Sequence, residues 1–292
     1  MSAPVAIVGL GLMGEVYARR LIDAGFSVTG FDIDPARCAR MAEIGGRPVQ
    51  SIGELARPAR CIIVAVFSTE QVEDVVENHL LPALGDGSGK IVLCMSTCDP
   101  DRVAALAGRV IPRGIRYLDV PVSGTSDQVR RGDGVALIGG DLTIAEEVKD
   151  VLDALFARRF HIGAVGDGGR AKLAVNLILG LNRLALAEGL VFAERLGLDP
   201  AAFLEVARGS ASYSQVMETK GAKMVQGDFS PEGRVRQTLK DARLMLDQAA
   251  AAGQKLSMLE VHAAVLEACV RAGEAELDNS AVIREVRRRG KN

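Results

Sequence analysis

The sequence predicts an α/β domain with a parallel, doubly wound sheet, followed by an all-α domain that a long helix joins to the first. Short β-rich runs alternate with amphipathic stretches up to about residue 163, which is typical of a parallel sheet. Beyond that point only helical patterns remain, and the first is too long for one small domain. The 292 residues leave room for two domains, which we place at 1–163 and 164–292.

The strands expected in the first domain are short apolar runs at residues 5–8, 27–31, 61–66, 90–94, 116–120 and 135–138. Amphipathic segments between them predict helices, most clearly at residues 15–24, 69–80 and 100–108. The strands are apolar without alternation, so we expect helices on both faces of the sheet.

The helix that opens the second domain is expected at about residues 169–196, before Gly197 and Pro200. At 1.5 Å per residue it would span roughly 40 Å. Its circumference is mostly apolar, so we expect other helices to enclose it, with a partner subunit helping to cover it. Those helices are predicted near residues 200–208, 213–226, 236–252 and 256–273. The polar Asn176 and the charged Arg183 favour a buried helix over a membrane span.

Composition and charge argue against several functions. The net charge is −2 and the sequence pI about 6.0, so we expect neither nucleic acid nor membrane as a partner. We interpret the basic cluster Arg287, Arg288, Arg289 and Lys291 as a solvated tail. Five cysteines without a CxxC pair, and only three histidines, predict no metal site. An odd cysteine count and no signal-peptide pattern fit a reducing cytoplasm.

A glycine-rich motif follows the first expected strand and precedes a helix. It reads Gly9, Leu10, Gly11, Leu12, Met13 and Gly14. In this strand–turn–helix setting, the G-x-G-x-x-G pattern is typical of a dinucleotide-binding loop. The glycines allow a tight turn and close backbone approach to a pyrophosphate, which the helix N-terminus attracts.

An acidic residue, Asp32, ends the second expected strand 18 residues after Gly14. A carboxylate there hydrogen-bonds the adenosine ribose hydroxyls and repels a 2′-phosphate. The alternative is a helix cap before Pro35, a role that Asp34 fits better. Arg37 could receive a phosphate, but it lies past Asp32 on the next helix. We therefore predict NAD as the cofactor.

Lys172 lies in the first turn of the predicted long helix. Partial burial and the positive end of the helix dipole both disfavour the ammonium and should lower the lysine pKa. Such a lysine can exchange a proton with an alcohol or carbonyl. Asn176, four residues on, shares its helix face and could hold a substrate oxygen. The alternative is a lysine that reaches solvent and an asparagine bonded within the helical domain.

Two further stretches follow expected strands at the edge where such sheets bind ligands. The hydroxyl and backbone N–H groups of Ser123 and Gly124 suit a carboxylate, although a polar turn explains them too. Ser96 and Thr97 fit a place near the nicotinamide ribose or, equally, a helix N-cap before Pro100.

With these motifs, the sequence resembles the 3-hydroxyisobutyrate dehydrogenase family, also called β-hydroxyacid dehydrogenases, which is related to 6-phosphogluconate dehydrogenase. Four motifs occur in the family's order: the loop at 9–14, the stretch 119–124, the segment 166–176 and the pair Lys240-Asp241. The sequence departs from the family at Thr125, usually glycine, at Leu177, often asparagine, and at Val66-Phe67, usually Leu-Pro. These departures lie around the substrate and nicotinamide positions.

The resemblance implies a Rossmann-type NAD-binding domain and a homodimer or homotetramer. It implies hydride transfer between a small carboxylate-bearing β-hydroxy acid and NAD, with Lys172 as general acid and base beside Asn176. It assigns substrate binding to Ser123, Gly124, Thr125, Lys172 and Asn176. Beyond the glycine loop and Asp32, cofactor binding would fall to Val66, Phe67, Thr97 and Lys240.

Two alternatives stay open. One is an NADP-dependent reductase of the same family that acts on a semialdehyde or on glyoxylate. The other is a non-catalytic NAD-binding structural module, which the presence of Lys172 and Asn176 disfavours. 6-Phosphogluconate dehydrogenases have histidine directly before the asparagine, where this chain has Val175, and imine reductases typically lack the lysine.

Overall fold

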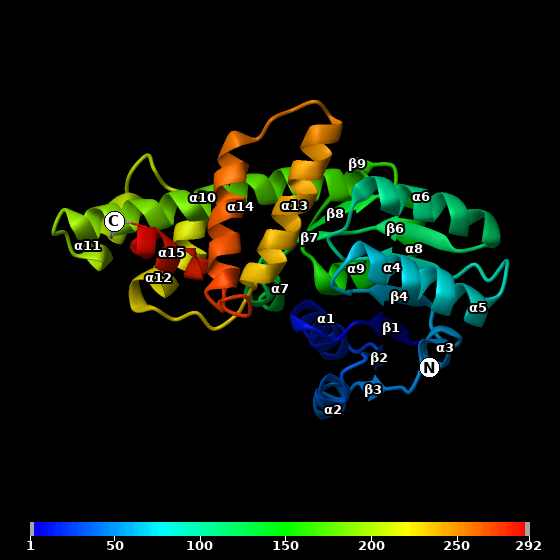
Figure 1. Cartoon of the computed structure of the whole chain (residues 1–292). Coiled ribbons are helices and arrows are strands. Elements are labelled where there is room, and N and C mark those ends of the chain that lie inside the picture. Colours follow the sequence, from blue (N-terminus) through cyan, green and yellow to red (C-terminus); the bar gives the residue numbers. More distant parts are fainter. Residues whose placement is uncertain (1–2, 290–292) are drawn as a thin grey trace. The chain divides into compact units, whose positions relative to one another are not determined.

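The computed structural model describes residues 3–289. Its backbone contacts divide the chain into two compact units, Met1–Lys172 and Leu173–Asn292. Figure 1 labels the elements of both units. The first unit runs past residue 163, because the turn after the last strand and the first helical turn beyond it pack on the same unit.

Within the described residues, the first unit holds one nine-stranded sheet, in the order β3-β2-β1-β4-β5-β6-β8-β7 with β9 paired to β8. The strands are β1 (Val5–Val8), β2 (Val28–Phe31), β3 (Arg47–Pro48), β4 (Cys61–Val64), β5 (Ile91–Cys94), β6 (Arg116–Asp119), β7 (Val122–Ser123), β8 (Val135–Gly139) and β9 (Arg158–Gly163). From β3 to β6 all pairs are parallel, which confirms the predicted fold class.

The far end of the sheet differs from the prediction. The run predicted at 135–138 as another parallel strand pairs antiparallel with both β6 and β7. A parallel return needs a crossover of a dozen or more residues, usually a helix. Here the connection contains only the two-residue β7 and the five-residue α7 (Ser126–Arg130), so β8 returns in the opposite direction.

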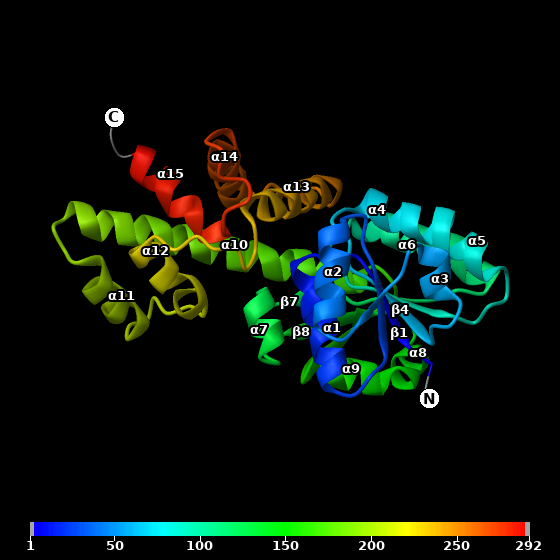
Figure 2. The same ribbon diagram turned by 90° about the horizontal axis from the view of Figure 1, so that it is seen from below.

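Helices cover both faces of this sheet, as Figure 2 shows from below. One face packs against α1 (Leu12–Asp23), α2 (Pro35–Glu43), α7, α8 (Leu142–Glu147) and α9 (Lys149–Leu155). The other packs against α3 (Ile52–Ala56), α4 (Thr69–Glu73), the π-helical η1 (Asp74–Leu80), α5 (Leu81–Leu84) and α6 (Pro100–Val110), which ends in η2 (Ile111–Arg113). Strand side chains alternate between the two cores, Val5 and Ile7 in one and Ala6 and Val8 in the other.

The second unit is helical throughout its described residues. It begins within α10 (Asp167–Arg195) and contains α11 (Pro200–Arg208), η3 (Met217–Gly221), α12 (Ala222–Gln226), α13 (Val235–Ala251), α14 (Ser257–Arg271), η4 (Asn279–Ala281) and α15 (Val282–Arg289). Its core joins Leu190, Leu204, Met224, Leu239 and Leu266 from five of these helices.

Within a single chain, the long helix α10 keeps part of its apolar surface exposed, which is where we expected a partner subunit to help cover it. Its 29 residues give a length of about 44 Å, and Ile178 and Phe192 are 61% and 65% exposed. Among the described residues it is the one helix long and apolar enough to cross a membrane, with 33% of its most apolar window buried. Core helices of soluble proteins meet the same criterion, so this is weak evidence for a span.

The basic cluster near the end is not a solvated tail. Arg287, Arg288 and Arg289 belong to α15, which the sequence did not predict. Arg287 pairs with Glu194, and Arg288 lies 2.8 Å from both Glu274 and Glu285. These residues are therefore helical and ion-paired, with acidic partners on α10, on α15 and in the turn after α14, although Arg288 and Arg289 remain exposed to solvent. Lys291 lies outside the described residues.

Candidate active site

The dinucleotide loop connects β1 to α1 and requires its glycines. Gly9 has a φ of +94°, which favours glycine. A Cβ on Gly14 would lie 1.9 Å from the Gly9 carbonyl oxygen, so only glycine lets the helix start this close to the strand. Gly11 precedes α1 and no side chain caps that end. The leading N–H groups of α1 therefore suit a pyrophosphate.

Asp32, directly after β2, ties this loop to the second strand. It is 9% exposed; its Oδ2 accepts the Leu10 N–H at 2.7 Å and its Oδ1 accepts the Asp34 N–H at 2.9 Å. The Arg37 guanidinium lies 3.2 Å from Asp32 and 3.4 Å from Asp34. The alternative role of Asp32 as the helix cap is wrong, since Asp34 caps α2 by accepting the Ala36 N–H.

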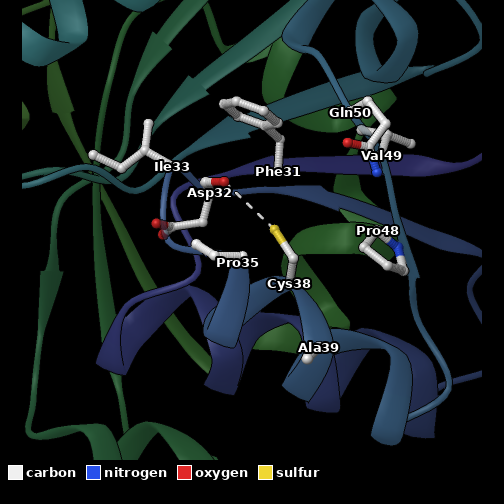
Figure 3. Close-up of a pocket in the computed structure, with 9 residues that line it drawn as sticks. All are labelled: Phe31, Asp32, Ile33, Pro35, Cys38, Ala39, Pro48, Val49 and Gln50. Carbon is white, nitrogen blue, oxygen red and sulfur yellow. Dashed lines mark hydrogen bonds between the residues drawn. The ribbon is translucent and has the colours of Figure 1, made fainter.

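A cleft of about 480 Å³ opens beside Asp32, within the usual range of roughly 300–1,000 Å³ for ligand sites. Figure 3 shows its walls, with Phe31 and Ile33 flanking Asp32, and Pro48 and Val49 on a separate segment. Ile33 is 87% exposed, although apolar. The Asp32 carboxylate points away from Pro48 and Gln50 in Figure 3, while Cys38 Sγ donates to the Asp32 backbone carbonyl oxygen at 3.4 Å. The sequence did not reveal these lining residues, because they come from scattered positions without a motif.

The carboxyl ends of β1, β4 and β5 bring a second group of predicted residues together. A Cβ on Gly9 would lie 3.1 Å from the Val66 side chain, and Ser96 Oγ donates to the Val66 carbonyl oxygen at 2.8 Å. Phe67 is 40% exposed and Thr97 is half-buried. The N-cap alternative for Ser96 and Thr97 is wrong, because Asp99 caps α6.

The predicted substrate stretch lies at the end of β7. Ser123 and Gly124 are half-buried, and Gly124 has a φ of +139°. Thr125 caps α7 in a capping box: its hydroxyl accepts the Gln128 N–H, and its own N–H donates to the Gln128 side chain. Thr125 thus orients the turn, and Ser123 and Gly124 are the better placed groups for a carboxylate.

Lys172 lies in the first unit, in the second turn of α10, and its side chain is nearly buried at 6% exposure. The start of this helix is fastened to β6, where the Gly169 N–H donates to the buried Asp119 carboxylate at 2.7 Å. Burial raises the pKa of Asp119 to about 7, and the N–H groups of Gly169 and Gly166 act in the opposite direction. Asp119 belongs to a recognised motif, yet the sequence analysis did not assign it a role.

Asn176 follows Lys172 by one helical turn and belongs to the second unit. Its Nδ2 donates to Asp241 Oδ2 at 3.0 Å, and Lys240 lies 3.0 Å from Asp241 Oδ1. The structure therefore joins Asn176 and Lys240 through Asp241, a contact that the sequence did not predict. Among the described residues, no group of three or more histidine, cysteine or acidic side chains could hold a metal ion.

Comparison with protein families gives two matches that together span most of the chain. The family model described as the NAD binding domain of 6-phosphogluconate dehydrogenase matches residues 4–163. The model described as "NAD-binding of NADP-dependent 3-hydroxyisobutyrate dehydrogenase" matches residues 166–286.

Whole proteins agree with these matches. The chain is 30% identical to L-threonate dehydrogenase of Cupriavidus necator, over 97% of this chain and 96% of that protein. It is 29% identical to 2-hydroxy-3-oxopropionate reductase of Escherichia coli, over 96% and 95%. The crystal structure of 3-hydroxyisobutyrate dehydrogenase from Salmonella typhimurium superposes with a TM-score of 0.88 at 28% identity, covering 97% and 99% of the two chains.

Proposed function

This chain belongs to the 3-hydroxyisobutyrate dehydrogenase family of NAD(P)-dependent oxidoreductases, and we propose that Lys172 is the acid and base of its reaction. The enzyme interconverts a small β-hydroxy acid and its semialdehyde or keto acid by hydride transfer. The observation that carries the proposal is an almost fully buried lysine near the start of α10. Burial disfavours its ammonium form. The sequence placed Lys172 in the first helical turn, but α10 begins at Asp167, so the lysine lies in the second turn, where the helix dipole acts less strongly.

In the proposed mechanism, the substrate carboxylate binds the Ser123 hydroxyl and the N–H groups at Gly124. Neutral Lys172 then accepts the proton of the substrate hydroxyl, and in the reverse direction it returns that proton to the carbonyl oxygen. Asn176 donates its amide N–H to Asp241, which leaves its Oδ1 as the acceptor that we propose for the substrate. The bound nicotinamide supplies the hydride acceptor.

Substituting Lys172 tests this role. Lys172→Ala should reduce kcat by about 10²–10⁴ and leave NAD binding intact, because the nucleotide loop and Asp32 lie on other elements. Lys172→Arg should be nearly as inactive, since a guanidinium does not release its proton near neutral pH. Rates would be measured on 3-hydroxyisobutyrate, 3-hydroxypropionate, L-serine, glycerate and threonate, with NAD affinity from fluorescence. Near-normal turnover by either variant would exclude Lys172 as the acid and base.

We also propose that the cofactor is NAD in preference to NADP. Asp32 supports this proposal, because its buried carboxylate lies where a 2′-phosphate would have to fit. The matched family description names an NADP-dependent enzyme, so the choice needs a measurement. The ratio of kcat/KM for NAD and NADP should favour NAD and fall in Asp32→Ser. A clear NADP preference would contradict this proposal and point to Arg37 as a phosphate ligand.

For assembly and location, we propose a cytoplasmic homodimer or homotetramer that binds neither nucleic acid nor membrane. The exposed apolar face of α10 supports an oligomer, because a second copy would remove Ile178 and Phe192 from water. Sedimentation should therefore give twice or four times the chain mass, and Phe192→Glu should shift it toward monomer. A monomeric natural protein, or one that needs detergent to stay in solution, would contradict the proposal.

A further inference from the structure

The start of α10 packs closely against three elements of the first unit. A Cβ on Gly168 would lie 2.6 Å from the Leu137 carbonyl oxygen on β8 and 3.0 Å from that of Asp119 on β6. A Cβ on Gly166 would lie 2.8 Å from the Pro100 carbonyl oxygen, where α6 begins. Such close backbone packing leaves no room for side chains, so the backbone of the turn contacts β6, β8 and the start of α6 directly.

The Asp119 side chain contacts the start of α10. Asp119 ends β6, is 2% exposed, and accepts the Gly169 N–H at 2.7 Å. Gly169 is in the first turn of α10, whose leading N–H groups have no acceptor within the helix. Lys172 follows Gly169 by three residues, and Ser123 follows Asp119 by four. One buried carboxylate therefore connects the strand that leads to the substrate stretch with the helix that carries the lysine.

We propose that Asp119 is a positioning residue for Lys172: it holds the first turn of α10 in place and thereby determines the position of the Lys172 amine. This inference rests on the proposed role of Lys172. The charge of Asp119 matters to it, because a hydrogen bond to an ionised acceptor is stronger than one to a neutral acceptor. A carboxylate at this end of the helix is also favoured by the helix dipole.

The protonation of Asp119 provides a readout that a purely structural side chain would not. Burial raises its pKa to about 7; Asp167 on α10 acts in the same direction, and Arg170 opposes it. On β6 itself, Tyr117 is also titratable; burial is the main cause of its raised pKa, Cys94 and Cys98 add to it, and Asp119 contributes least. As the pH falls through about 7, Asp119 gains a proton, the bond from Gly169 weakens, and Lys172 is held less firmly.

The test compares Asp119→Ala and Asp119→Asn with a control at the same helix start. Asp119→Ala should lower kcat by about 10–10², the typical effect of a misplacement near 1 Å, with NAD affinity unchanged. Asp119→Asn should keep more activity, because its amide oxygen can still accept the Gly169 N–H. It should also lose the decline in rate near pH 7 and keep the rise due to Lys172. Asp101→Asn removes an exposed ion pair with Arg170 but leaves the bond from Gly169 to Asp119 in place, so it should behave like the natural protein.

A double substitution separates positioning from other roles. In a Lys172→Ala background, Asp119→Ala should cause no further loss of kcat, because Asp119 acts only through the lysine. Additive losses, or a decline near pH 7 retained in Asp119→Asn, would overturn the proposal. Should Asp119→Ala fail to fold, the pH profile of Asp119→Asn decides. If Lys172→Ala stays active, the proposed function itself fails, whatever Asp119 does.

Discussion

Replacing His262 should remove one pH-dependent part of the stability of the helical unit. His262 on α14 is 1% exposed and lies over Gly180, where a Cβ would come within 2.7 Å of its ring. Burial lowers its pKa from the ordinary 6.5 to about 4, and the charge of Arg183 acts in the same direction. His262 is therefore protonated below about pH 6.5 in the unfolded chain, but only below about pH 4 in the folded chain.

The sign and size of the effect follow from this difference. The stability due to neutral His262 is present in full above pH 6.5 and is lost as the pH falls toward 4. The gap corresponds to roughly 3 kcal/mol of unfolding free energy at 1.36 kcal/mol per pKa unit. His262→Leu keeps an apolar side chain over Gly180 but cannot titrate, so its unfolding free energy should lack this decline.

Denaturant unfolding, followed by circular dichroism from neutral pH down to about pH 4, measures the difference between natural protein and His262→Leu. The comparison between variants is needed because Asp119, with its pKa raised to about 7, has the opposite sign: its contribution is lost as the pH rises. His79→Gln is the matched control, since His79 is exposed and should leave the curve unchanged. Parallel curves for the natural protein and His262→Leu would refute the assignment of a buried, neutral imidazole.

Two further predictions concern the cofactor. Lys240→Ala should raise KM for NAD, because we expect this lysine to reach the cofactor, whereas Lys255→Ala, at an exposed site, should not. An unchanged KM and kcat would contradict a cofactor role for Lys240, which pairs with Asp241. Gly14→Ala should weaken NAD binding by about 1–3 kcal/mol, because its Cβ would overlap the backbone of Gly9, and equal NAD affinity would contradict that geometry. Gly108→Ala, with open space around its Cβ, is the control and should bind NAD normally.

The sequence predicted the central strands well because each is a short apolar run buried on both faces. β1 and β4 begin at the predicted residues, and the register between them pairs Val5 with Cys61. β9 has the opposite character: its six residues are mostly exposed, and it forms at the edge by pairing with β8. Its apolar residues, Phe160 and Ile162, alternate with polar ones and are not buried, so this strand lacks the continuous apolar run that marks the central strands.

In the candidate site, too, the residues of a local motif could be predicted, whereas contacts between residues far apart in the sequence could not. The glycine loop lies within six consecutive residues and Asp32 follows at a regular interval, so a single sequence reveals both. Gly169 and Asp119 are 50 residues apart, and Asn176 and Asp241 are 65 apart. Each of these residues lies in one of the recognised motifs, but no local pattern shows that the two partners of a pair meet, because that depends on the fold.

The division of α10 between the two units has a consequence for catalysis. Lys172 is the last residue of the first unit. The hydrogen bond from Gly169 to Asp119 holds the preceding turn of α10 against the sheet that also carries the glycine loop. The position of the proposed acid and base relative to that loop therefore depends on contacts within one unit. Asn176 belongs to the second unit, where Asp241 orients its amide.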